Sequence, residues 1–76
     1  MAKAPTDAQV REYITGYYES REDLERFKIK SIGSSREGPE CRDVSVYTEW
    51  GGSDPFVETC TWTVWVETDG TVYGEH

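Results

Sequence analysis

The chain has 76 residues, with eight Lys and Arg against fifteen Asp and Glu, which gives a formal net charge of −7. This length allows one domain, and three Trp, five Tyr and two Phe supply apolar area for a small core without a metal or a disulfide. The acidic balance argues against direct binding to nucleic acid or to an anionic membrane. Because residues 1–10 lack an apolar signal segment and no apolar stretch approaches the length of a membrane span, we expect a cytoplasmic location.

The charge is divided unevenly along the chain. Residues 1–42 hold all eight Lys and Arg together with eight acids, so their charges cancel. Residues 43–76 hold seven acids and no Lys or Arg. This asymmetry predicts one acidic face, rather than an evenly acidic surface.

The first predicted element is an amphipathic helix over residues 6–19, after a disordered N-terminus at residues 1–5. Thr6 and Gln9 have the spacing of a capping box. Apolar residues then recur at helical spacing, and we expect them to cover the sheet: Val10, Ile14 and Tyr17, with Tyr13 at the border. Ser20 with Asp23 suggests a second, short helical turn that carries Leu24.

From Phe27 onward the apolar period changes to two, which is typical of strands. We predict four strands, over residues 27–31, 43–50, 56–67 and 71–74, with residues 33–40 as a loop marked by two glycines and Pro39. The expected fold is α+β: one N-terminal helix packed on a four-stranded antiparallel meander sheet, in the order α-β-β-β-β and in two layers. Residues 1–76 form a single domain, with the sheet over 27–76.

Strand register decides which side chains share a face. Placing Trp50 opposite Phe56 gathers the apolar residues on one inner face: Val44, Val46, Trp50, Phe56, Cys60, Trp62, Val64 and Val66. A three-residue loop, 68–70, with Gly70 left-handed then pairs Trp65 with Tyr73. Both rings therefore point to the outer, threonine-rich face.

The outer face is the predicted binding surface. Trp65 and Tyr73 are expected near Tyr47, with acids around them, so that aromatic anchors have a polar border as in many protein interfaces. The candidate partner-binding residues are Tyr47, Trp65, Tyr73, Asp43, Glu49, Glu67 and Glu75. The alternative is that these aromatics serve only as cross-strand packing pairs.

No catalytic residue, metal site or cofactor site is predicted, and we do not expect an enzyme. Cys41 and Cys60 are expected about 16 Å apart along the sheet, too far for a disulfide, so both should be free thiols. His76, the only His, stands at the end of the sequence and is expected to be mobile, and no cluster of ligands has the spacing of a zinc or calcium site.

The sequence therefore predicts a small acidic adaptor or inhibitor that binds a basic protein surface as a monomer or weak dimer. A sharper version is that it mimics nucleic-acid charge, by analogy of size and charge with small phage-encoded proteins, and so meets a nucleic-acid-binding protein. One alternative is a small-ligand module whose shape resembles cystatin-like and NTF2-like folds, with a pocket lined by Tyr13, Tyr17, Tyr18, Trp50 and Trp62. Another is a structural domain with no specific partner.

Overall fold

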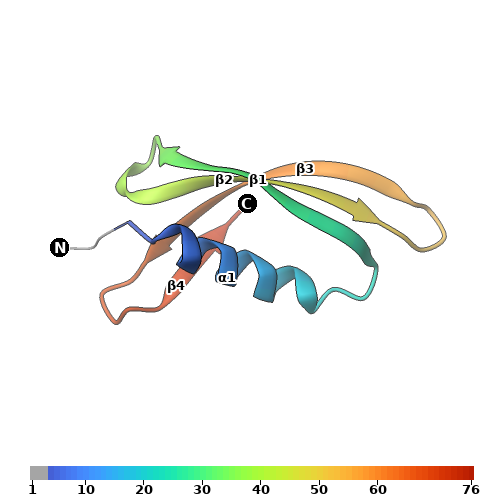
Figure 1. Ribbon diagram of the computed structural model, residues 1–76, viewed down its shortest axis with the longest axis horizontal. Coiled ribbons are helices and arrows are strands. Elements are labelled where there is room, and N and C mark those ends of the chain that lie inside the picture. The colour runs from blue at the N-terminus through green and yellow to red at the C-terminus, as the bar shows by residue number, and fades with distance from the viewer. Residues whose placement is uncertain (1–3) are drawn as a thin grey trace.

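The computed structural model describes residues 4–76 and contains one helix and one sheet (Figure 1). The elements are α1 (Asp7–Glu19), β1 (Leu24–Ser35), β2 (Gly38–Trp50), β3 (Phe56–Val66) and β4 (Val72–Glu75). The sheet is antiparallel, with its strands in the order β1-β2-β3-β4. The predicted helix on a four-stranded meander is confirmed. Within residues 4–76 no helix has both the length and the hydropathy to span a membrane.

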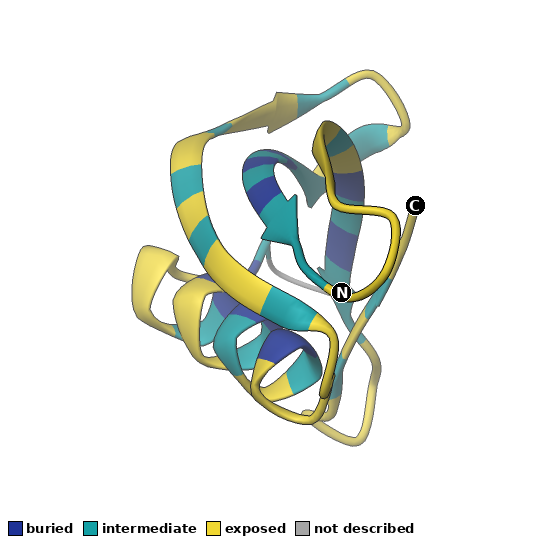
Figure 2. Ribbon diagram, turned by 90° about the vertical axis from the view of Figure 1, so that its right-hand side faces the viewer, coloured by how far each residue is buried: buried dark blue, intermediate teal, exposed yellow. Residues whose placement is uncertain are grey.

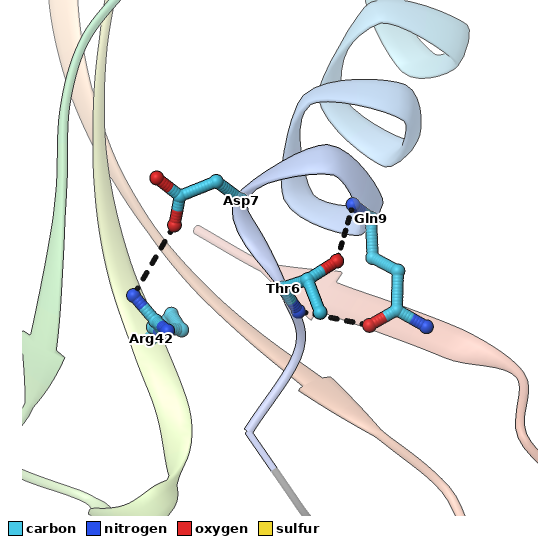
Figure 3. Close-up of polar contacts among 4 residues, drawn as sticks. All are labelled: Thr6, Asp7, Gln9 and Arg42. Carbon is cyan, nitrogen blue, oxygen red and sulfur yellow. Dashed lines mark hydrogen bonds and ion pairs between the residues drawn. The ribbon is translucent and has the colours of Figure 1, made fainter.

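The start of α1 is fixed by the predicted capping box. The Thr6 hydroxyl accepts a hydrogen bond from the Gln9 N–H at 3.1 Å, and the Gln9 side chain accepts one from the Thr6 N–H at 2.8 Å (Figure 3). Next to it, Arg42 of β2 reaches Asp7 at 3.4 Å and ties the helix to the sheet. Disorder was expected for residues 1–5. Within this segment Pro5 is buried, and residues 1–3 lie outside the described residues.

The helix buries a stripe of every fourth residue. Val10, Ile14 and Tyr18 are buried, whereas Tyr17 is only partly covered. Tyr17, expected to cover the sheet, does pack against the core at its edge, whereas the fully covered position is Tyr18. The spacing of four keeps the three residues on one face of the helix, and Tyr17 lies beside that face.

The inner face of the sheet completes the core (Figure 2). Val44, Val46 and Val64 are fully buried, and Trp62 is 2% exposed. The Trp62 Nε1 donates to the Tyr18 hydroxyl at 3.1 Å, which joins the helix to the sheet. Thr48 is also fully buried.

The predicted registers of the last three strands are confirmed. Trp50 pairs with Phe56, and Cys60 pairs with Val46. Trp65 pairs with Tyr73. In the turn between β3 and β4, Gly70 has a φ of +88°, a conformation that glycine adopts without steric cost.

Two predictions for the first half of the sheet are wrong. Leu24 is not in a helical turn but begins β1, where it pairs with Trp50. Residues 33–40 are not a loop, because β1 and β2 extend to a two-residue turn at Arg36 and Glu37. Pro39 is tolerated in β2 because the pairing of β2 with β3 begins only at Cys41, so no ladder hydrogen bond to β3 is lost at Pro39.

The helix is shorter than the strands it covers. Thirteen helical residues span about 20 Å, whereas the 13 residues of β2 span about 43 Å. The β1–β2 and β2–β3 turns therefore extend past the two ends of the helix, and the molecule measures 46 × 22 × 17 Å (Figure 1). Phe56, expected in the core, lies beyond the end of α1; it is 53% exposed and stacks on Trp50.

Candidate functional site

The outer face of the sheet carries a paired aromatic group at the β3–β4 end. The rings of Trp65 and Tyr73 lie 6.4 Å apart at an interplanar angle of 25°. The Trp65 Nε1 donates to the Glu67 carboxylate at 2.8 Å, which holds the indole in place. Trp65 is partly buried and Tyr73 is 45% exposed. Both rings therefore remain partly exposed to solvent.

Carboxylates surround this pair. Glu75 follows Tyr73 on the same face of β4. Thr63 of β3 pairs with Asp43 of β2 on one side and with Glu75 of β4 on the other. We call the group formed by Asp43, Trp65, Glu67, Tyr73 and Glu75 the acidic aromatic patch. Sequence reasoning had brought all five residues to one face, and the register places them together.

The electrostatics of the patch are one-sided. β3 and β4 contain no Lys or Arg, and the Arg42 guanidinium is engaged with Asp7 next to the helix. Cys41 lies directly opposite Trp65. Burial, followed by the charges of Glu40, Glu37 and Asp43, raises the pKa of the Cys41 thiol. The negative charge near Trp65 is therefore not neutralised by basic residues on these strands.

Tyr47 and Glu49 do not belong to this patch. Tyr47 lies opposite Thr59, six positions along β3 from Trp65, which corresponds to about 20 Å. The expectation that Tyr47 lies near Trp65 and Tyr73 is therefore wrong. The partners of Tyr47 and Glu49 on β1 are basic, since Lys28 pairs with Tyr47 and Arg26 with Glu49.

The basic side chains of β1 give this second area a different character. The Arg26 guanidinium reaches the Glu49 carboxylate at 3.9 Å. Partial desolvation, and then the neighbouring Glu49, raise the pKa of the Tyr47 hydroxyl. The outer face therefore has an acidic end at β3–β4 and a mixed end at β1.

A groove lies beside the helix, at a place that the sequence did not predict, although Tyr13 and Tyr17 were expected to line a pocket. It has a volume of about 530 Å³ and runs between α1 and β4, lined by Gln9, Glu12, Tyr13, Gly16, Tyr17 and Val72. The available signal was the sequence Tyr-x-x-Gly-Tyr at residues 13–17, because it places a glycine among large rings on one side of the helix.

The space under the helix is filled by the aromatic residues expected to line a ligand pocket. Trp62 packs edge-on against Tyr13, Tyr17 and Tyr18, with ring centroids 4.7–6.1 Å apart. Trp50 lies at the end of this cluster, 6.4 Å from Tyr18. These contacts are those of a packed core.

The cysteines and the histidine do not form a common site. Cys41 and Cys60 are both free. Burial, followed by the Glu58 carboxylate at 2.8 Å, raises the pKa of the Cys60 thiol to about 11. His76, expected to be mobile, packs its ring 4.1 Å from that of Trp62. Among residues 4–76, no three His, Cys, Asp or Glu side chains come together as metal ligands would.

Comparisons with known proteins give no information on function, so the proposal below is based on the fold and the patch. No protein family, no curated protein and no solved structure matches the chain.

Proposed function

We propose that this domain is a small acidic binding module that docks the acidic aromatic patch on a basic surface of another protein. The observation that carries the proposal is the stacked pair of Trp65 and Tyr73 on an open sheet face, among three carboxylates and on strands without a basic residue. Aromatic anchors with a charged border are typical of protein interfaces.

The carboxylates and the aromatic rings of the patch contribute differently to binding. The carboxylates of Asp43, Glu67 and Glu75 attract a cationic surface and raise the rate of association, an effect that salt weakens. The rings supply the area that is removed from water in the complex. Since Glu67 already holds the Trp65 indole, little side-chain entropy is lost when the partner binds.

A partner that normally binds nucleic acid has the matching charge. Such proteins present a basic groove that follows a row of phosphates, and the carboxylates of the patch offer negative charge on a rigid sheet. We therefore propose a nucleic-acid-binding protein as the preferred partner class. This step rests on the charge and size of the domain.

The test is affinity capture from a lysate of the source cells, followed by binding measurements with the purified captured protein. The variant Trp65→Ala/Tyr73→Ala removes the anchors, and Val57→Ala is the matched control, since Val57 is an outer-face side chain that is 63% exposed at the far end of β3. We expect wild type and Val57→Ala to bind equally and the double variant to lose at least about tenfold in affinity, or about 1.4 kcal/mol.

Salt and competition complete the test. The affinity should fall as the salt concentration rises, and duplex DNA should displace the domain if the partner surface binds nucleic acid. A captured protein whose affinity is the same for wild type and for the folded double variant would refute the proposal.

A further inference from the structure

The edge of β4 presents backbone groups that no strand among residues 4–76 uses. β4 has β3 on one side only. The Glu67 N–H donates to the Thr71 carbonyl at 2.9 Å, and in an antiparallel ladder hydrogen-bonded and non-hydrogen-bonded pairs alternate. The N–H and C=O groups of Val72 and Gly74 therefore point away from β3. The Tyr13 hydroxyl confirms this direction, because it donates to the outward Gly74 carbonyl at 3.2 Å.

The groove beside α1 lies along the same edge, since Val72 is one of its lining residues. Tyr13 and Tyr17 give it apolar walls. Gly16 keeps it open on the helix side: a Cβ added there would meet no atom within 4 Å, so packing does not require a glycine. Glycine inside a helix costs about 1 kcal/mol relative to alanine, and at this position it leaves room for a side chain from outside.

The two faces of β4 differ in chemistry. Tyr73 and Glu75 point to the acidic outer face, and Val72 and Gly74 point to the helix side. A strand added to this edge would alternate in the same way. Its side chains would lie by turns beside the acidic aromatic patch and in the groove.

We infer that β4 and the groove bind an extended segment of the partner as a fifth strand, with basic residues facing the patch and apolar residues in the groove. Recognition of the basic residues rests on the proposed function. The Val72 N–H and C=O and the Gly74 N–H supply the backbone hydrogen bonds, as in other cases of strand addition. A second copy of this chain is disfavoured as occupant, because pairing β4 with β4 brings the carboxylates of two patches together.

The probe is a capped eight-residue peptide that alternates arginine and valine, compared with a peptide of the same composition in two blocks. Binding is followed by NMR titration, and amide hydrogen exchange is measured at Val72 and Gly74. We expect the alternating peptide to bind at least about tenfold tighter, the effect of one or two net hydrogen bonds. It should slow exchange at both amides.

Two variants test the strand edge and the groove. Val72→Pro removes the outward N–H and leaves the ladder to β3 intact, because that N–H does not face β3. Gly16→Leu fills the groove, and Ala8→Leu is its control on an exposed part of α1 outside the groove. We expect Val72→Pro and Gly16→Leu each to weaken the alternating peptide at least about fivefold, or about 1 kcal/mol, and Ala8→Leu to leave its affinity unchanged.

The outcomes separate this inference from the proposed function. If both peptides bind equally and only Trp65→Ala/Tyr73→Ala weakens them, the patch docks by charge and strand addition is refuted. Strand addition is also refuted if neither peptide binds, or if the two amides remain unprotected. If an alternating serine–valine peptide binds as tightly as the arginine peptide and protects both amides, strand addition stands and the acidic docking falls.

Discussion

Replacing Trp62 by alanine tests the face assignment on which the patch depends. Trp62 is 2% exposed, contacts three tyrosine rings of α1 and donates a hydrogen bond to the Tyr18 hydroxyl. Trp65 lies three residues further along the same strand, on the other face, and contacts Tyr73 alone among the aromatic rings of residues 4–76. The two tryptophans should therefore respond differently to the same substitution.

The expected loss of stability follows from the buried area. A tryptophan side chain buries about 150–250 Å², which at about 25 cal/mol per Å² corresponds to about 4–6 kcal/mol. Truncation of a buried aromatic to alanine typically costs about 3–5 kcal/mol, and a 76-residue domain has a free energy of unfolding of about 4–11 kcal/mol. Trp62→Ala should therefore remove a large part of this stability. Trp65→Ala loses a partly exposed cross-strand pair, which is worth about 0.2–1 kcal/mol.

The assay is urea unfolding followed by far-UV circular dichroism, since tryptophan fluorescence would itself change in both variants. We expect Trp62→Ala to be largely unfolded or to have a much lower midpoint, and Trp65→Ala to unfold close to wild type. If Trp62→Ala lost less than about 1 kcal/mol, or if Trp65→Ala were the more damaging change, the assignment of the two faces would be wrong.

Further predictions concern packing, a buried hydroxyl and a thiol. A Cβ at Gly74 would lie 2.7 Å from a ring carbon of Tyr13, so Gly74→Ala should cost about 1–3 kcal/mol in urea unfolding. The buried Thr48 hydroxyl donates to the Glu58 carbonyl at 3.1 Å and accepts from the Trp50 indole N–H at 2.9 Å. Thr48→Val removes both hydrogen bonds and should therefore cost about 1–3 kcal/mol in the same assay. With a thiol pKa of about 11, Cys60 should alkylate slowly at pH 8 and faster as the pH rises toward 11. Glu58→Gln should lower this pKa and speed alkylation at pH 8; an unchanged rate would contradict the contribution of the carboxylate.

The part of the fold that could be predicted is the part in which apolar residues recur at every second position. From Val44 to Tyr73 every inner position is apolar except Thr48, Glu58 and the turn residues, so a slip of one residue would bury threonines and expose valines. That contrast determined the register of β2, β3 and β4. It also predicted the pairing of Trp65 with Tyr73.

The first strand shows where local signals fail. Ser20 and Asp23 favour a helical cap, but the chain from Leu24 pairs with the far end of β2, and the Gly51 N–H donates to the Asp23 carbonyl at 2.8 Å. Long-range pairing of this kind outweighs local propensity. The basic residues of β1 consequently lie beside Tyr47 and Glu49, which divides the outer face in a way that the charge count of each half did not predict.

The error over Tyr47 has a different origin. Alternation tells which face a residue occupies, but only the register tells how far apart two residues on that face lie. Pairing Trp50 with Phe56 already implies Cys41 opposite Trp65, and this places Tyr47 six positions away. The predicted register therefore already implies the separation of Tyr47 from Trp65, whereas a shared face does not imply that two residues are close.

The groove could not be found in this way, because it depends on the position of the helix relative to the edge of the sheet. Tyr13 was expected only to border the core, but its hydroxyl reaches the Gly74 carbonyl and its ring lies where a Cβ of residue 74 would be. Gly74 thus lets the helix approach β4 closely, while Gly16 leaves open space in the groove, because a Cβ there would meet no atom within 4 Å. Gly74 therefore sets the packing of the edge and Gly16 the width of the groove, and this is the geometry that the proposed strand addition requires.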